Sequence, residues 1–339
     1  MPSWASTVWV ILCCKQAKEG THMKKITRRV MVGDVAIGGG APVVIQSMLS
    51  VPSTDIEGNV LQAKRLEAAG CRIIRTAVPD ESAVKLILAL KKAVSIPVVA
   101  DIHFDYRLAL KCAEAGVDKI RINPGNIGDD SRVKAVADKC KANNIPIRIG
   151  VNSGSLEKSI LEKYNGVTAD ALVESALYHA SLLEKFDFDD IVLSMKASNV
   201  KLMSDAYKTA SNRTNYPLHL GVTEAGTERM GLIKSAAGIG GLLLSDIGDT
   251  IRVSLTDDPT LEIKAAKDIL KAVGLRNTGA NIVCCPTCGR TKVDLEKIVA
   301  DVERKLAPLQ ESLGDRKLKI AVMGCVVNGP GEATDADVA

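Results

Sequence analysis

The chain has 339 residues, of which 46% are hydrophobic and 25% are charged, the composition of an ordinary soluble globular protein. Aromatic residues make up only 3%, which argues against stacking platforms for single-stranded nucleic acid. The net charge of +4 is not gathered in a basic block, so nucleic acid is not an expected partner.

Residues 1–22 contain a short apolar run, "WVILCC", inside "MPSWASTVWVILCCKQAKEG". The run lacks the basic start and the cleavage site of a signal peptide, and it is too short to span a membrane. Because Met23 opens a more natural beginning, "MKKITRRVMVGD", we expect residues 1–22 to be a disordered extension or a mis-set start. No other stretch reaches transmembrane length. We therefore expect a cytoplasmic protein without a membrane partner.

Short β-rich runs recur along residues 43–256, and each is followed by a segment with apolar residues at helical spacing. Such alternation predicts a parallel sheet, and eight units in this length favour a (β/α)₈ TIM barrel over residues 23–275. An open doubly wound sheet is the alternative, weakened because no glycine-rich dinucleotide fingerprint follows the first strand. The expected strands are 43–48, 71–78, 97–103, 118–125, 146–154, 190–198, 217–226 and 249–256.

A smaller α/β unit is expected after the barrel. The polar link "RNTGAN" (276–281) is the predicted boundary, so residues 280–339 form the second domain. It contains "NIVCCPTC", a helical "DLEKIVADVERKLAPL" and a strand "KLKIAVMG". One helix and two strands make a thin core, so we expect this domain to be C-terminally truncated. By contrast, Cys71, Cys112 and Cys140 lie among Ala and Val, which predicts small buried side chains.

Several predicted strands carry basic or polar residues inside apolar runs. A buried Arg without a partner is costly, so each must meet a carboxylate or an anionic ligand. Internal Arg–Asp pairing is one interpretation; a phosphate or diphosphate site at the C-terminal mouth of the barrel is the other. The residues concerned are Arg75, Arg121 with Asn123, Arg148 with Asn152, and Lys196, and Asp101, His103, His219 and Glu224 lie at or near other strand ends.

Three cysteines of the second domain have cofactor spacing. "CPTC" places Cys285 and Cys288 on one metal centre, and Cys325 in "GCVVNGPGE" adds a third thiolate. A structural zinc site wants four Cys or His ligands, whereas an iron–sulfur cluster with three thiolates leaves one iron for another group. The nearest candidate is Glu332, beyond the Gly-Pro-Gly turn. Cys284 is expected to be a bystander, because adjacent residues of an extended chain diverge.

At this point the chain resembles a known family. "CPTC", "GCVVNGPGE", "RINPGN", "IRIGVNSGSL", "HLGVTEAG" and "IGDTIRVSL" together are similar to the hydroxymethylbutenyl diphosphate synthases, from about Met23 to the last residue. That family reductively opens methylerythritol cyclodiphosphate on the methylerythritol phosphate route to isoprenoids. The resemblance implies a [4Fe–4S] cluster held by Cys285, Cys288, Cys325 and Glu332. It also implies flavodoxin or ferredoxin as electron donor.

The resemblance extends to the barrel residues. It implies a substrate site made of Arg75, Asp101, Arg121, Asn123, Arg148, Asn152 and Lys196. Glu224 is the expected proton donor with His103 second, and Glu332 is expected to yield its iron to a substrate oxygen. Family members usually continue beyond the last motif, and residues 1–22 have no counterpart in them.

Two other functions stay open from the sequence. One is a phosphate- or pterin-binding barrel, such as a transferase, with a structural metal tail. The other is a non-catalytic iron–sulfur carrier or sensor, against which the Arg-lined barrel argues. We also expect a homodimer, because the eighth helix of a (β/α)₈ barrel returns the chain to the face opposite the mouth.

Overall fold

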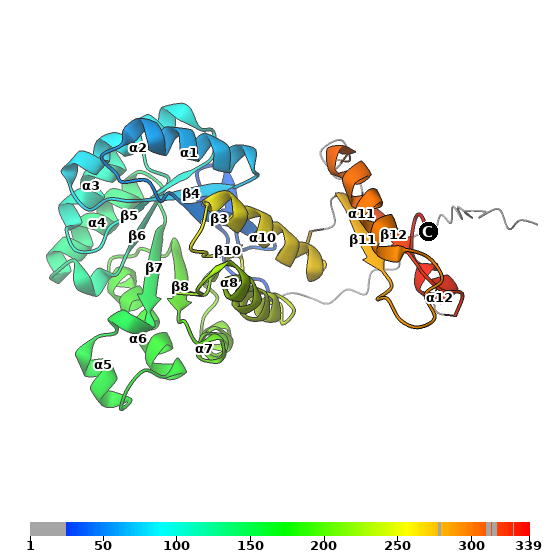
Figure 1. Cartoon of the computed structure of the whole chain (residues 1–339). Helices are drawn as coiled ribbons and strands as arrows, with labels where there is room; N and C mark the ends of the chain where they lie inside the picture. The colour runs from blue at the N-terminus through cyan, green and yellow to red at the C-terminus, as the bar shows by residue number, and fades with distance from the viewer. Residues whose placement is uncertain (1–24, 277–278, 310–312, 314–316, 328) are drawn as a thin grey trace, which may run out of the picture. The chain divides into compact units, whose positions relative to one another are not determined.

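The computed structural model of the protein describes residues 25–276, 279–309, 313, 317–327 and 329–339. The expected extension at residues 1–22 therefore lies outside the described residues. The described chain forms two compact units, which divide between Leu275 and Arg276. Figure 1 shows the two units, residues 25–275 and the residues from 276 onward.

The larger unit is a ring of eight parallel strands. Neighbours are hydrogen-bonded in the order β8-β7-β6-β5-β4-β3-β10-β9. An isolated parallel bridge joins Leu193 of β8 to Leu218, the residue before β9, so the ring closes. The predicted (β/α)₈ barrel is confirmed. The strands are β3 (Val44–Met48), β4 (Ile73–Ala77), β5 (Val98–Asp101), β6 (Lys119–Ile122), β7 (Ile147–Asn152), β8 (Ile191–Lys196), β9 (His219–Leu220) and β10 (Thr250–Ile251).

Helices surround the ring and bury their apolar faces against it (Figure 1). Polar caps begin many of them: the side chains of Asp105, Asp129 and Asn199 accept hydrogen bonds from backbone N–H groups of the first helical turns. The predicted burial of Cys71, Cys112 and Cys140 is confirmed. The helices are α1 (Ile56–Ala68), α2 (Val84–Ala93), α3 (Tyr106–Glu114), α4 (Asp130–Ala142), α5 (Lys158–Lys163), α6 (Ala169–Glu184), α7 (Val200–Arg213), α8 (Glu228–Ser235), α9 (Gly241–Leu243) and α10 (Pro259–Ala272).

A small hairpin covers the N-terminal ends of the barrel strands. β1 (Val30–Val32) pairs antiparallel with β2 (Val35–Ile37). Its buried side chains Val32, Val35 and Ile37 pack with Val44, Ile73 and Val99, which lie at the starts of β3, β4 and β5. The hairpin thereby closes the barrel at the end opposite the mouth, a feature that the sequence analysis did not predict.

The smaller unit has its own core. β11 (Gly279–Cys284) pairs in parallel with β12 (Lys317–Val322), and Cys284 is level with Val322. Helix α11 (Leu295–Leu306) contributes Leu295, which is buried with Ala280, Ile320 and Val322. A short helix, α12 (Gly329–Ala333), follows. β11 starts inside the predicted link, because Gly279, Ala280 and Asn281 already pair with β12.

Candidate active site

One cavity of the barrel opens where the strands end. It has a volume of about 260 Å³, and we call it the anion cavity. Its lining contains four guanidinium groups and one ammonium group against one carboxylate. Its residues are Met48, Arg75, Asp101, His103, Arg121, Arg148, Gly150, Asn152, Ser194, Lys196, Thr223, Arg252 and Ser254.

Asp101 at the end of β5 holds two of the arginines. Its carboxylate lies 3.1 Å from Nη1 of Arg121 and 3.5 Å from Nε of Arg75. Burial by itself would raise the pKa of Asp101, but the attraction of Arg75, Arg121 and Arg148 outweighs it and lowers the pKa to about 2. The internal Arg–Asp pairing weighed from the sequence is therefore present, but one carboxylate cannot neutralise this set.

Arg148 is an arginine of the cavity that the Arg–Asp pairing leaves incompletely hydrogen-bonded. Its side chain is 1% exposed, and Nε and Nη1 have no hydrogen-bond partner among the described residues. Its neighbour Arg121, directly opposite in register, donates from Nη2 to the Gly150 carbonyl at 2.7 Å. A Cβ at Gly150 would collide with that guanidinium, so glycine is needed there. Buried cationic donors without partners can bind an anionic ligand.

Two further cations complete the charge of the anion cavity. Lys196 is 7% exposed, and burial, followed by repulsion from Arg252 and Arg75, holds its pKa well below the ordinary value. Arg252 lies 3.7 Å from Glu262, whose pKa burial raises. The sequence analysis missed Arg252. The signal was available, because "IRVS" in the eighth predicted strand repeats the pattern of an Arg between two β-branched apolar residues seen in "IRIN" and "IRIG".

Two expected site residues do not line the cavity. The Asn123 side chain instead accepts a hydrogen bond from the Gly150 N–H at 3.1 Å, which ties β6 to β7. Glu224 follows β9 with an exposed side chain and a left-handed backbone (φ 49°). His103 does line the cavity, and its Nε2 lies 3.7 Å from Asp101. His219 is fully buried with Nδ1 2.6 Å from the Thr250 hydroxyl, outside the lining.

The pairing of β11 with β12 places the cysteines at one sheet edge. Cys285 directly follows β11, and its N–H donates to the carbonyl of Val322, the last residue of β12. Cys325 lies three residues after Val322. The carboxyl ends of parallel strands meet at the same edge, so the "CPTC" turn and Cys325 come together. Glu332 is exposed on α12, and Cys284 is exposed at the end of β11.

Arg290 is the common neighbour of the three predicted thiol ligands. Its pKa is raised, first by a hydrogen bond with Cys288 and then by the charges of Cys288, Cys325 and Cys285. Hydrogen bonds from Arg290, the backbone first, lower the pKa of the Cys288 thiol, which favours the thiolate that binds metals. No group of three or more His, Cys, Asp or Glu side chains at metal-binding distance occurs in the described part of the chain. The donor types nevertheless fit an iron–sulfur group, because three cysteine thiols interact with the same arginine.

Fold and site together define a class: a (β/α)₈ barrel with an arginine-lined cavity, followed in the chain by an α/β unit that carries three cysteines near one sheet edge. The "GcpE TIM-barrel domain" model matches residues 27–267, and the "GcpE protein C-terminal domain" model matches residues 281–339. The chain belongs to the GcpE family.

Curated relatives carry one name, "4-hydroxy-3-methylbut-2-en-1-yl diphosphate synthase (flavodoxin)". The protein of Caldanaerobacter subterraneus subsp. tengcongensis is 56% identical over 93% of this chain and 88% of the relative. That of Clostridium perfringens is 57% identical over 93% and 89%. That of Bacillus cereus strain AH187 is 53% identical over 94% and 85%. The family resemblance found in the motifs is confirmed.

Solved structures with a similar fold are more distant. Dihydropteroate synthase of Yersinia pestis matches with a TM-score of 0.53 at 13% identity, over 73% of this chain and 98% of that one. N-acetylneuraminic acid synthetase of Leptospira borgpetersenii matches with a TM-score of 0.52 at 15% identity, over 83% and 98%. At such identity the likeness concerns the barrel fold alone, so it lends no support to a pterin-binding function. No helix among the described residues is long and apolar enough to cross a membrane.

Proposed function

We propose that this protein opens 2-C-methyl-D-erythritol 2,4-cyclodiphosphate reductively and releases 4-hydroxy-3-methylbut-2-enyl diphosphate, on the methylerythritol phosphate route to isoprenoids. Two electrons and two protons enter, and one water leaves. Family membership supports this reaction, as do the names of relatives at 53–57% identity. The main structural support for this reaction is the buried Arg148 guanidinium. Its Nε and Nη1 have no hydrogen-bond partner among the described residues and can donate to phosphate oxygens.

Substrate binding is assigned to the anion cavity. Arg75, Arg121, Arg148 and Lys196 supply charge-assisted hydrogen bonds to the diphosphate, and Arg252 joins them. Asp101 keeps Arg75 and Arg121 spread, so the guanidinium groups are in place before the substrate arrives. Asn152 lines the same wall. Asn123 does not line the cavity and supports it indirectly, by accepting a hydrogen bond from the Gly150 N–H.

Proton delivery is assigned to His103 or Glu224. His103 lines the cavity, and a half-exposed imidazole next to Asp101 can exchange its proton with solvent. Glu224, the donor expected from the sequence, is exposed outside the lining. The substitutions His103→Asn and Glu224→Gln distinguish the two candidates when both variants are assayed at the same concentration of reduced electron donor. Replacement of the true proton donor should lower kcat, while the Kd for the substrate stays near the wild-type value.

For the cofactor we propose a [4Fe–4S] cluster held by Cys285, Cys288, Cys325 and Glu332. Such a group supplies the one-electron chemistry that no side chain can provide. Three thiols around Arg290 at one sheet edge support the assignment. The word flavodoxin in the relatives' names supports reduced flavodoxin as the electron donor, with ferredoxin as the alternative.

The experiment for the cofactor uses anaerobically purified protein. Cys285→Ser, Cys288→Ser and Cys325→Ser should each lose iron, sulfide and the brown visible absorption, whereas the matched control Cys284→Ser should keep all three. A full complement of iron and sulfide in Cys325→Ser would contradict the ligand set. Zinc without sulfide in the wild type would contradict the cluster itself. Anaerobic turnover of the cyclic diphosphate with a reduced artificial donor tests the reaction.

We further propose a homodimer in which the cysteine unit of one chain serves the anion cavity of the other. The helices of a (β/α)₈ barrel run back to the end opposite the mouth, and α10 is the last of them. Only residues 276–278 separate Leu275 from β11, a link that spans at most about 14 Å. A partner's cysteine unit meets the mouth without this restriction.

A further inference from the structure

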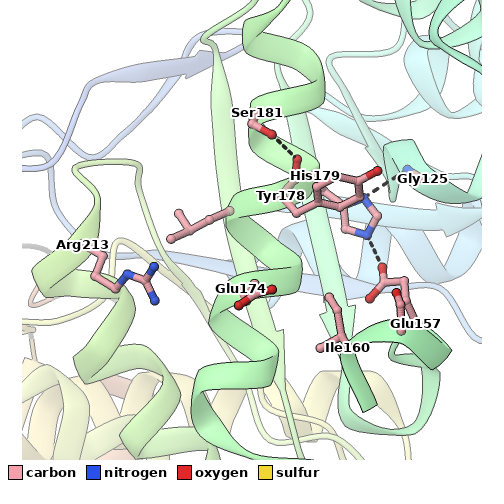
Figure 2. A pocket seen from close by; sticks show the side chains of 10 residues that line it. Gly125, Glu157, Ile160, Glu174, Tyr178, His179, Ser181 and Arg213 are labelled. Atoms are coloured by element: carbon pink, nitrogen blue, oxygen red, sulfur yellow. Dashed lines mark hydrogen bonds and ion pairs between the residues drawn. The ribbon is translucent and has the colours of Figure 1, made fainter. Parts of the chain in front are cut away.

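A buried histidine outside the anion cavity contacts the loops that follow β6 and β7. His179 lies on α6, is 0% exposed, and has both ring nitrogens in hydrogen bonds (Figure 2). Nδ1 lies 3.1 Å from the backbone N–H of Gly125, and Nε2 lies 2.5 Å from Oε1 of Glu157. A backbone N–H can only donate, so Nδ1 accepts. The neutral ring therefore carries its proton on Nε2 and donates it to the Glu157 carboxylate.

The first of these loops directly follows β6. Gly125 is the centre of the 3₁₀ turn Pro124–Asn126, which the Asn126 N–H closes on the Asn123 carbonyl at 2.9 Å. Asn123 in turn accepts from the Gly150 N–H, and the Gly150 carbonyl accepts from Arg121. A chain of hydrogen bonds thus runs from His179 through this turn to a guanidinium of the anion cavity.

The second loop follows β7. Glu157 comes five residues after Asn152, which lines the anion cavity, and it precedes the first residue of α5. Its carboxylate also accepts from the Ser175 hydroxyl at 2.9 Å. Burial would raise the pKa of Glu157, but hydrogen bonds from His179, the backbone and Ser175 lower it to about 2. One imidazole therefore joins a neutral turn after β6 to a charged loop after β7.

Steric fit marks this contact as specific. A Cβ at Gly125 would lie 2.6 Å from Cε1 of His179, so only glycine permits the approach. Space-filling is not the reason for a histidine here, because a cavity of about 580 Å³ adjoins the ring. Figure 2 shows the ring between Gly125 and Glu157, with Glu174 and Arg213 on the remaining wall. An apolar side chain would fill the position equally well but would leave the Gly125 N–H and Glu157 without their partner.

We propose that His179 is a positioning residue for substrate binding: it clamps the turn after β6 to the loop after β7 and so holds Arg121 and Asn152 in their binding geometry. This role rests on the proposed function, since it assumes that the anion cavity receives the cyclic diphosphate. His179 itself does not touch the substrate, so its effect belongs to affinity and not to the chemical step.

The test compares variants that keep or remove each of the two His179 hydrogen bonds, to Gly125 and to Glu157. His179→Leu removes both hydrogen bonds, and His179→Asn keeps an acceptor near the Nδ1 position. Glu157→Gln keeps an acceptor for Nε2. Tyr178→Phe is the matched control, because Tyr178 lines the same neighbouring cavity. Calorimetry with the cyclic diphosphate gives Kd, and urea unfolding of the same samples reports the fold.

We expect His179→Leu to raise Kd at least tenfold, with His179→Asn recovering most of the affinity and Tyr178→Phe matching wild type. Hydrogen exchange of the Gly125 amide should quicken in the Leu variant and return toward wild type in the Asn variant. If His179→Leu does not fold, Gly125→Ala applies the same test from the loop side and should raise Kd similarly. Wild-type Kd in a folded His179→Leu or Gly125→Ala protein would overturn the inference. If wild-type protein itself fails to bind the cyclic diphosphate, the proposed function fails instead.

Discussion

Arg121 and Arg148 face each other in register on β6 and β7, yet their surroundings differ. Arg121 has Asp101 and the Gly150 carbonyl as partners. Arg148 keeps two buried nitrogens without a partner among the described residues. The free energy of unfolding should therefore respond oppositely to the loss of each charge, although both belong to the anion cavity.

Arg148→Met should leave the free energy of unfolding unchanged or raise it by about 1–3 kcal/mol, the cost of buried donors without partners. Arg121→Met should lower it by a similar amount, because Asp101 and the Gly150 carbonyl lose a donor. Both variants should bind the cyclic diphosphate roughly ten- to hundredfold more weakly. Urea unfolding and calorimetry on one set of samples measure both quantities. Equal destabilisation by the two substitutions would mean that Arg148 is already satisfied in the empty protein.

Asp101 predicts an acid-sensitive step in stability. Its pKa falls from 3.8 when unfolded to about 2 in the folded protein. A lowered carboxyl pKa stabilises the fold above the unfolded value, and that contribution is lost as the pH falls from about 4 to about 2. The shift corresponds to roughly 2–3 kcal/mol. Urea unfolding between pH 5 and pH 2.5 should show a shallower pH dependence for Asp101→Asn than for wild type; parallel curves would rule out this role.

At the scale of elements, the eight strands of the barrel were predictable because each is an apolar run bounded by turn residues and helical periodicity. Hairpin β1–β2 was not predicted, since each strand has only three residues, although Gly33-Asp34 between them is a hairpin signal. Side-chain direction was harder to foresee. Glu224 was expected near the end of the predicted strand 217–226, whereas β9 ends at Leu220 and the Glu224 side chain is exposed.

The hairpin allows stability to be separated from binding. Ile37 on β2 is fully buried among Val44, Ile73 and Val99 at the barrel end opposite the anion cavity. Ile37→Ala should lower the free energy of unfolding by about 2–5 kcal/mol, through lost burial and a cavity. Inorganic pyrophosphate should bind the folded variant with wild-type affinity, as calorimetry can measure. A large loss of affinity would show that the hairpin shapes the mouth as well.

At the scale of the whole molecule, the proposed shared site predicts complementation. Arg121→Ala and Cys325→Ser should each be inactive alone. After subunit exchange, a heterodimer with shared sites contains one site with both lesions and one with neither, so part of the activity should return. The control mixes Arg121→Ala with Arg148→Ala, whose lesions both lie in the barrel and leave no intact pair. Proven exchange without recovery would mean that each chain serves its own barrel.

The two separate cores have a consequence for what damage does to this protein. The anion cavity is lined by barrel strands and by residues that directly follow them, whereas the core around Leu295 belongs to the cysteine unit. If the proposed iron–sulfur group is lost, turnover should therefore stop, while the folded barrel should still bind the cyclic diphosphate. After oxygen damage to that group, the inactive protein would keep its substrate bound. Reassembly of the group would then allow the bound substrate to be converted to product without refolding of the chain.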